Sequence, residues 1–355
     1  MASQLFSPLT IKKTVLKNRI AISPMCQYSA TDGFANDWHL VHLGSRASGG
    51  AGLIIQEATA VSPEGRISPQ DLGLWKDEQI EKLQTITHFI LSQNSVPGIQ
   101  LAHAGRKASV SSPWNGNRKL DESQGGWNTV APSAVGYHSN EEAPIALDQT
   151  GIQKVISDFK AATKRAVQVG YQVLEIHAAH GYLLHQFLSP LSNFRKDEYG
   201  GSFENRIRLV LEVLEAAQSE WPKDLPLLVR ISASDWADGG WNIQESVKLS
   251  KILKEKGVDL IDTSSGGLVS HQQIPLGPNY QVPFAEQIKK ETGIMTGAVG
   301  LITGALQAEE IIASGKADLV LFARESLRNP NLGLSFAHEL QADIDWPNQY
   351  DRAKI

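Results

Sequence analysis

The sequence predicts an α/β fold of the (β/α)8 barrel type, a TIM barrel built from a single domain. Short apolar runs alternate eight times with longer amphipathic runs along the 355 residues. The apolar runs have the composition of parallel strands that are buried on both faces. No Gly-x-Gly-x-x-Gly motif follows the first run. Open doubly wound sheets usually have five or six strands and a glycine-rich first turn, so the barrel is favoured.

Eight short segments are predicted to form the barrel strands. In chain order they are Arg19 to Ser23, Gly52 to Gln56, Pro97 to Leu101, Gln172 to Ile176, Leu227 to Ile231, Leu260 to Thr263, Ile294 to Gly297 and Leu319 to Phe322. The segments between them have helical spacing, as in Ile152, Val155 and Phe159, which predicts helices with one buried stripe. Asn205, Pro283 and Thr303 are expected near helix starts, and Gly170, Gly257 and Gly315 near helix ends.

The stretch at about residues 104–150 is too long for a plain connection between a strand and a helix. It is rich in Gly, Ser, Asn and Pro. Long loops of this kind in barrels usually serve function, so we interpret it as an insertion over the barrel mouth and not as a separate domain.

Composition excludes several classes of function. The chain has 33 Lys and Arg against 38 Asp and Glu, a net charge of −5, and it has no basic run, so nucleic acid is not expected as a partner. No apolar stretch approaches the roughly 18 residues of a membrane span, and residues 1–8 lack the features of a secretory signal, so we expect a cytoplasmic protein. The single cysteine, Cys26, excludes an intrachain disulfide and any site built on several thiolates.

Barrel enzymes place their catalytic groups at the carboxyl ends of strands, so the residues at the end of each predicted strand and just after it matter most. These residues are mainly polar or small. They are Ser23 to Tyr28, Glu57 and Ala58, Gln100 and His103, His177 to Tyr182, Arg230, Ser264 to Gly267, Gly297 and Gly300, and Arg324.

Two of these positions suggest a bound anion. Gly297 to Gly300 would let backbone N–H groups approach a phosphate, and Arg324 could add a guanidinium clamp; otherwise the glycines only form a turn and Arg324 pairs with an acid. Arg230 follows the apolar run Leu227 to Val229, so its charge is expected at a strand end that faces the barrel mouth. A buried arginine requires an anionic partner, which is either a core acid or a ligand such as a reduced flavin.

His177 and His180 lie three residues apart at a strand end, where both side chains can enter one pocket. With Glu175 or Glu57 they could bind a metal, but no third ligand for a catalytic zinc is evident. Without a metal they could hold a substrate carbonyl or nitro oxygen, and Tyr182 would be a plausible general acid. Structural histidines are the plainer alternative.

Cys26 has two interpretations as well. It is either a small buried hydrophobe or a residue lying against a flat cofactor ring. We see no Cys, His and Asn constellation that would make it a nucleophile.

With these residues in place, the chain resembles the old yellow enzyme family of FMN-dependent ene-reductases, in particular its bacterial "thermophilic-like" branch with one cysteine beside the flavin. The resemblance runs nearly end to end. Its motifs are Ser23 to Tyr28, Glu57 to Val61, Gln100 to Ala108, His177 to Pro190, Ser192 to Ser202 and Glu204 to Arg206.

The resemblance implies a role for each matching residue. Those that would contact FMN are Ser23, Pro24, Met25, Cys26, Ala58, Gln100 and Arg230, with Gly300, Ala323 and Arg324 at its phosphate. His177 and His180 would bind the substrate's oxygen, and Tyr182 would protonate Cα. Tyr28 would line the substrate pocket, and Cys26 would tune the flavin potential.

The resemblance also implies an activity and an assembly. NADPH, or NADH, would reduce FMN, and the flavin would then reduce the C=C bond of α,β-unsaturated aldehydes, ketones, imides and nitroalkenes in a ping-pong cycle. The protein would be a homodimer or homotetramer whose tail, at about residues 343–355, places Arg352 in a neighbouring active site. The alternatives are a metal-dependent hydrolase or lyase on the same barrel and a flavin-binding protein without catalytic activity.

Overall fold

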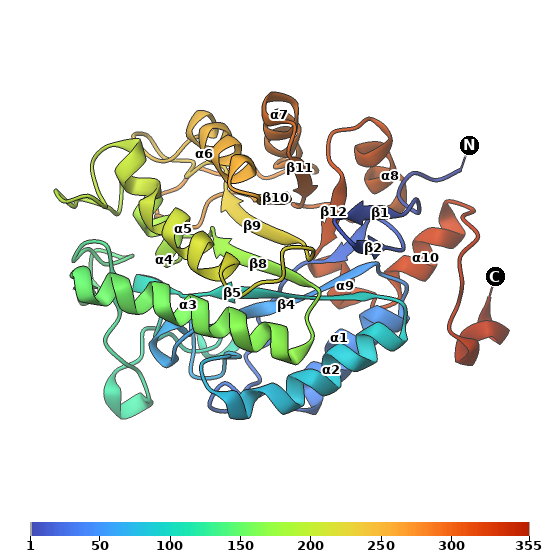
Figure 1. Ribbon diagram of the computed structural model, residues 1–355, viewed down its shortest axis with the longest axis horizontal. Helices are drawn as coiled ribbons and strands as arrows, with labels where there is room; N and C mark the ends of the chain where they lie inside the picture. Colours follow the sequence, from blue (N-terminus) through green and yellow to red (C-terminus); the bar gives the residue numbers. More distant parts are fainter. Residues whose placement is uncertain (1, 355) are drawn as a thin grey trace.

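The computed structural model describes residues 2–354 and contains a closed barrel of eight parallel strands (Figure 1). The strands are β3 (Ile20–Ile22), β4 (Leu53–Ala60), β5 (Val96–Ala102), β8 (Val173–Ala178), β9 (Leu227–Ser232), β10 (Leu260–Ser264), β11 (Met295–Ala298) and β12 (Leu319–Phe322). Pairing of β12 with β3 closes the barrel. The predicted fold class is confirmed, and each predicted segment overlaps one barrel strand, although Gly52 to Gln56 covers only the first half of β4.

Helices between and after the strands cover the outside of the barrel (Figure 1). They are α1 (Asp37–Ser48), α2 (Ile80–Ser92), α3 (Gln149–Val169), α4 (Leu183–Leu188), α5 (Phe203–Gln218), α6 (Ile243–Glu255), α7 (Val282–Thr292), α8 (Ala305–Ala313), α9 (Arg324–Arg328) and α10 (Leu332–Glu339). In α3 the predicted stripe is buried, and the helix ends at Gly170 in the left-handed conformation that glycine favours. Asn205 lies in the first turn of α5, as expected, but the helix begins earlier, at Phe203, because Ser202 caps it by accepting the N–H of Asn205.

Two apolar layers hold the barrel together. One lies between the strands and the helices, and the other fills the barrel interior. The antiparallel hairpin of β1 (Leu9–Ile11) and β2 (Thr14–Leu16) contributes Leu9, Ile11 and Leu16 to the interior layer, where they join Leu53 and Leu228. The amino end of the barrel is therefore closed by hydrocarbon, and the polar strand-end residues lie at the other end. Among residues 2–354 no helix is long and apolar enough to cross a bilayer.

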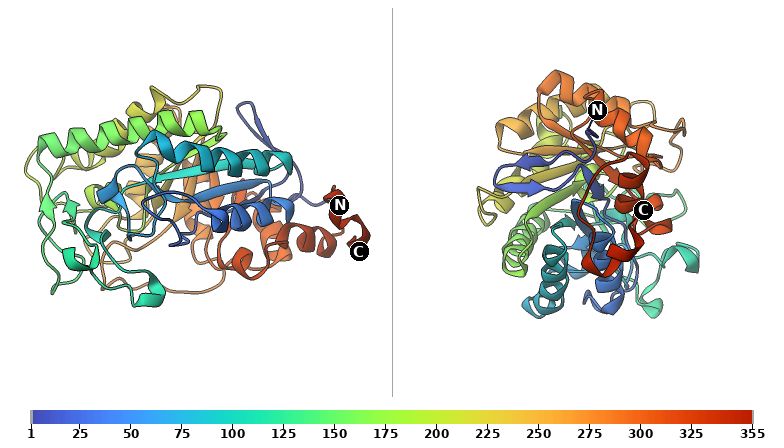
Figure 2. Two further views of the ribbon diagram at one scale, coloured as in Figure 1. Left: turned by 90° about the horizontal axis from the view of Figure 1, so that it is seen from below. Right: turned by 90° about the vertical axis from the view of Figure 1, so that its right-hand side faces the viewer.

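The segment between β5 and α3 contains three 3₁₀ turns and the short parallel pair β6 (Val130–Ala131) and β7 (Ile145–Ala146). It lies at the end of the molecule opposite both termini (Figure 2). Arg106 Nη2 donates to the carbonyl of Leu268 at 2.8 Å, and Trp127 Nε1 donates to that of Glu64 at 2.9 Å. The segment is thus tied to loops that follow other strands.

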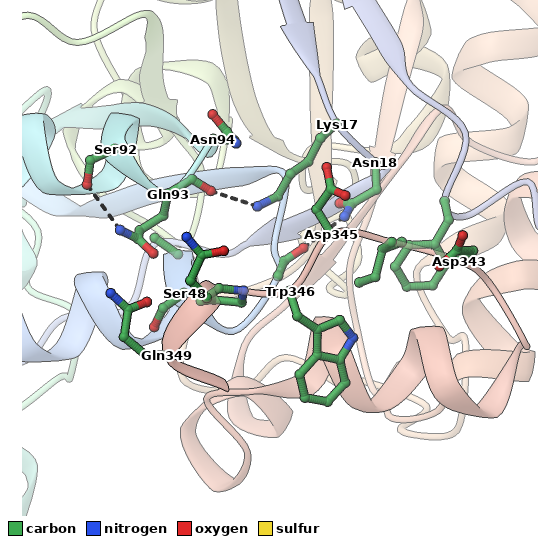
Figure 3. A pocket seen from close by; sticks show the side chains of 16 residues that line it. Lys17, Asn18, Ser48, Ser92, Gln93, Asn94, Asp343, Asp345, Trp346 and Gln349 are labelled. Carbon is green, nitrogen blue, oxygen red and sulfur yellow. Dashed lines mark hydrogen bonds between the residues drawn. The ribbon is translucent and has the colours of Figure 1, made fainter. Parts of the chain in front are cut away.

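The C-terminal tail follows α10 and packs near the amino end of the barrel (Figure 1). It encloses a cavity of about 700 Å³ together with residues that precede β3 and β5 (Figure 3). In this cavity Lys17 Nζ donates to the carbonyl of Gln93 at 3.0 Å. Burial lowers the pKa of Lys17 to about 8, although the nearby charge of Asp345 opposes the shift.

Candidate active site

The end of β8 brings three of the predicted catalytic residues together. His177 is in the strand, and His180 and Tyr182 are in the turn that follows. The ring centroid of His177 lies 5.1 Å from that of His180 and 5.0 Å from that of Tyr182, and both ring pairs meet edge to face. The structure therefore places the three side chains in one cluster, as the spacing predicted.

The backbone of this turn is left-handed at two successive residues. The φ angle is +58° at His180 and +71° at Gly181. A left-handed residue other than glycine costs free energy and needs support from its surroundings. That support comes from two hydrogen bonds of 2.9 Å, in which the N–H of His180 donates to Ser232 Oγ and the N–H of Gly181 donates to His185 Nδ1.

Both histidines of the cluster are neutral at neutral pH. Burial lowers the pKa of His177 and of His180 well below the ordinary value, and the charge of Arg230 adds to the effect. A neutral imidazole has one N–H donor and one acceptor nitrogen. His180 Nε2 lies 2.7 Å from Ser264 Oγ. His177 Nδ1 is buried and has no hydrogen-bond partner among residues 2–354.

Acid should destabilise the folded protein through these two histidines. Below a pH of about 6.5 the two histidines bind protons in the unfolded chain but stay neutral in the folded protein. As the pH is lowered further, the free energy of unfolding therefore falls by about 1.4 kcal/mol per pH unit for each histidine. Urea unfolding between pH 8 and pH 5 measures this slope. The variant His177→Asn cannot titrate at this position and should lose one histidine's share of the slope; an unchanged slope would contradict the neutral assignment.

Tyr182 and Cys26 lie in a mainly apolar cluster with Ile67, Ala104 and Ala108. Burial raises the pKa of the Tyr182 phenol well above its ordinary value, so the group can donate a proton but does not act as a base. Burial also raises the pKa of the Cys26 thiol, and the charges of nearby carboxylates raise it further. Because the thiolate is the reactive form, Cys26 is not placed to act as a nucleophile.

The loop after β3 carries Ser23 to Tyr28 and is held at both ends. The N–H of Ser23 donates to the carbonyl of Phe322 at 3.0 Å, and the N–H of Gln27 donates to Glu57 Oε2 at 2.7 Å. Tyr28 has a φ of +48°, and its ring lies edge-on to Trp114 with centroids 5.7 Å apart. The sequence suggested Glu57 only as a metal ligand, whereas its carboxylate fixes the loop that presents Cys26.

Arg230 and Gln100 meet acidic side chains inside the barrel. Arg230 Nη1 donates to Ser23 Oγ at 3.2 Å, and Arg230 Nε lies 3.1 Å from Asp262 Oδ2. Gln100 Nε2 donates to Glu175 Oε1 at 2.7 Å. The sequence left open whether the anionic partner of Arg230 is a core acid or a ligand. The structure contains such an acid, Asp262.

The predicted phosphate residues follow the paired strands β11 and β12, so their loops are neighbours. Gly300 has a φ of +117°, a conformation that favours glycine. Ala323 is the residue before α9, and Arg324 is the first residue of that helix and is exposed. No acidic side chain forms an ion pair with Arg324 within the described part of the chain. Burial raises the pKa of the Tyr280 phenol, and the nearby charges of Arg324 and Arg230 oppose this rise.

The metal-dependent alternative needs a third ligand beside His177 and His180. Within residues 2–354 no three His, Cys, Asp or Glu side chains lie close enough to hold one ion. His180 Nε2 instead faces the hydroxyl of Ser264, which the sequence had not singled out as its partner.

Arg352 lies in the 3₁₀ turn Asn348–Ala353 and is exposed. The tail residues before Arg352 line the cavity together with Lys17 and Asn18, which precede the amino end of β3 (Figure 3). His177 lies near the carboxyl end of β8, which is the opposite end of the barrel. The structure does not bring Arg352 together with the other predicted site residues of the same chain.

Comparison with known proteins identifies the family. The model of the NADH:flavin oxidoreductase / NADH oxidase family matches residues 4–343. The chain belongs to this family. NADPH dehydrogenase of Bacillus subtilis is 47% identical over 99% of both chains. An NADH:flavin oxidoreductase of Gibberella zeae is 48% identical over 99% of this chain and 89% of its own.

Solved structures agree with this assignment. Morphinone reductase in complex with tetrahydroNAD has a TM-score of 0.78 and 26% identity, over 97% of this chain and 92% of that chain. Old Yellow Enzyme from Pichia sp. AKU4542 has a TM-score of 0.78 and 25% identity, over 95% and 87%. The resemblance to the old yellow enzyme family is confirmed. The protein is an FMN-dependent oxidoreductase that uses NADPH or NADH.

The residues of this old yellow enzyme family member fit a bound FMN. Arg230 is a buried cation at the carboxyl end of β9, as an anionic reduced ring requires. Arg324 has no acidic partner among the described residues, and Gly300, with its positive φ, lies in the loop after the neighbouring strand β11. The half-buried Met25 and the buried Ala58 supply apolar surface for a flat ring.

Sequence reasoning missed the role of Lys107 in this site. Lys107 Nζ donates to the carbonyls of His180 and Gly267, both at 2.8 Å, and lies 5.3 Å from the ring centroid of Tyr182. Burial lowers its pKa to about 8. Its position in the run His103 to Ala108, which carried part of the resemblance, was the only available signal.

Proposed function

We propose that the protein is an ene-reductase that reduces the C=C bond of α,β-unsaturated aldehydes, ketones, imides and nitroalkenes in a ping-pong cycle with NADPH. The observation that carries this proposal is the cluster of two neutral imidazoles and one protonated phenol, in which the ring centroid of His177 lies 5.1 Å from that of His180 and 5.0 Å from that of Tyr182. Such a set can donate hydrogen bonds to the oxygen of the substrate and one proton to its carbon. Reduction of a polarised alkene needs both kinds of donor.

Each residue of the cluster would have a distinct role. Bound FMN supplies the hydride that it receives from NADPH. His177 and His180 hold the electron-withdrawing oxygen of the alkene and stabilise the charge that develops there. When Ser264 donates to His180 Nε2, the ring proton lies on Nδ1 and is available to the substrate. Tyr182 gives its phenolic proton to Cα.

The remaining predicted residues would bind the cofactor and shape the pocket. Arg230 offsets the negative charge of the reduced ring, and Arg324 with the Gly300 turn binds the phosphate. Ser23, Pro24, Met25, Cys26, Ala58, Gln100 and Ala323 complete the FMN contacts. Tyr28, supported by Trp114, lines the substrate pocket. Cys26 lies beside Tyr182 in the apolar cluster and tunes the flavin potential as a neutral thiol.

The visible spectrum of the purified protein tests the whole cycle. The protein should show flavin bands that bleach when NADPH is added without oxygen and return when 2-cyclohexenone is added. Flavin bands that bleach but do not return would favour an oxidoreductase with another acceptor. Bands that never bleach would favour the flavin-binding protein without catalytic activity.

Replacing Arg324 by Ala should weaken FMN binding by about 10-fold to 100-fold, since a hydrogen bond to a charged group contributes about 1.5 to 3 kcal/mol. Fluorescence titration of the protein with FMN gives the dissociation constant. Arg328→Ala is the matched control, because Arg328 is on the same helix and pairs with Glu325. Equal affinity in both variants would show that the phosphate lies elsewhere.

The proposal extends to assembly and location. The position of the tail at the amino end of the barrel supports a homodimer or homotetramer in which Arg352 enters a neighbouring active site, because it cannot reach its own. Sedimentation gives the oligomer size, and Arg352→Ala should raise KM for the alkene without releasing FMN.

The hydrogen bonds from Arg106 and Trp127 support the view that the insertion at about 104–150 caps the site within one domain. We place the enzyme in the cytoplasm, where NADPH is supplied.

A further inference from the structure

Two carboxyl groups and one guanidinium are buried together in the barrel interior, just below the histidine cluster. Glu175 and Asp262 are fully buried, and Arg230 is 5% exposed. They come from the adjacent strands β8, β9 and β10, with Asp262 opposite Arg230 in the strand register. The proposed cycle gives no role to either acid.

The hydrogen bonds of this group are incomplete unless an additional proton is present. Glu175 Oε1 accepts from Gln100 Nε2, but Oε2 has no partner. Asp262 Oδ2 lies 3.1 Å from Arg230 Nε without forming a directed hydrogen bond, and Oδ1 has no partner. Glu175 and Asp262 are within hydrogen-bond reach of each other. Two facing carboxylates only repel, whereas one proton between them satisfies both.

The same proton also balances the charge. Two carboxylates and one guanidinium would leave a net negative charge inside the barrel, which is costly in a low-dielectric interior. With one proton the three groups are neutral together. Asp262 is the anion, because it lies against Arg230, and Glu175 carries the proton, because its other partner is the neutral Gln100.

We propose that Glu175 and Asp262 share one proton beneath Arg230, and that Asp262 alone, as the counter-ion of Arg230, limits how strongly the guanidinium stabilises the reduced flavin. Asp262 is a positioning residue that acts through Arg230, and Glu175 holds the shared proton. Burial and the charge of Asp262 raise the pKa of Glu175 well above its ordinary value, in agreement with this arrangement. The inference rests on the proposed placement of Arg230 beside FMN.

Two substitutions separate this arrangement from one with two ionised acids. Glu175→Gln copies the protonated acid, because the amide oxygen can accept from Gln100 and the amide N–H can donate to Asp262. The flavin midpoint potential should then stay as in the wild type. Asp262→Asn in the Glu175→Gln background, where Glu175 cannot ionise in its place, removes the counter-ion and should favour binding of reduced over oxidised FMN by at least tenfold, which is a rise of about 30 mV for a two-electron couple.

The experiment combines potentials with infrared spectra of the purified holoenzyme. Dye-equilibrated titration gives the potentials, and the difference spectrum of wild type minus Glu175→Gln should contain the carbonyl band of a protonated carboxylic acid. This difference isolates Glu175 from other buried acids such as Glu57. If the double variant does not fold, the infrared band and the potential of Glu175→Gln still decide whether Glu175 carries the proton.

Three outcomes would overturn the inference. A missing band would show that Glu175 is ionised, and a raised potential in Glu175→Gln would show the same. An unchanged potential in the folded double variant Glu175→Gln/Asp262→Asn, with the band present in the wild type, would break the link to the flavin. A protein that is purified without FMN and does not bind it would refute the proposed function instead, while the band would still report on the carboxyl pair.

Discussion

Replacing Tyr182 by Phe is expected to slow alkene reduction by about 10² to 10⁴-fold and to leave reduction of the flavin by NADPH nearly unchanged. The phenol is protonated in the folded protein and lies beside His177, which would hold the substrate's oxygen. Phe keeps the ring and its packing against the apolar cluster of Ile67, Ala104 and Ala108 but has no proton to give. Only the half-reaction that needs a proton at Cα should therefore slow.

Rapid mixing measures the two half-reactions separately. NADPH is mixed with the oxidised enzyme in one experiment, and 2-cyclohexenone is mixed with the reduced enzyme in the other. Tyr137→Phe is the matched control, because Tyr137 also lies against Lys107, at 4.7 Å, but is not in ring contact with His177. Equal slowing of both half-reactions in Tyr182→Phe would remove Tyr182 from the role of proton donor.

Replacing Gly181 by Ala is expected to destabilise the protein by about 3 kcal/mol or more and to displace the histidine cluster. A Cβ at this position would lie 2.1 Å from the carbonyl oxygen of Gly267. That oxygen is backbone and accepts a hydrogen bond from Lys107, so it cannot move away freely. The left-handed φ of +71° adds about 1 to 2 kcal/mol for any residue other than glycine.

Gly239→Ala isolates the steric part of this effect. Gly239 has nearly the same φ, +73°, but a Cβ there meets no atom within 4 Å. Urea unfolding should show a loss of only about 1 to 2 kcal/mol for this variant, and alkene reduction should be retained. Equal losses of stability in the two variants would show that the contact with Gly267 does not constrain the turn.

The sequence alone was sufficient to predict the barrel and the set of polar residues that lie at the carboxyl ends of its strands. Strands buried on both faces are apolar throughout, so all eight could be recognised without knowledge of their neighbours. Parallel strands also place their carboxyl ends on one side, so His177, Arg230 and Arg324 had to lie at the same end of the molecule. Helix boundaries such as that at Ser202 were less certain, because a cap depends on local hydrogen bonds.

Only the tertiary structure decided which polar groups become partners at that end of the barrel. Ser264 reaches His180 from β10, and Lys107 reaches the carbonyl of His180 from the insertion. Asp262 faces Arg230 because β9 and β10 pair in one particular register. These contacts join residues that are between 32 and 84 positions apart in the chain. Spacing along the sequence does not show which of two residues so far apart in the chain will meet in the fold. Burial nevertheless makes a partner necessary, because a polar group that is removed from water must form hydrogen bonds with another polar group.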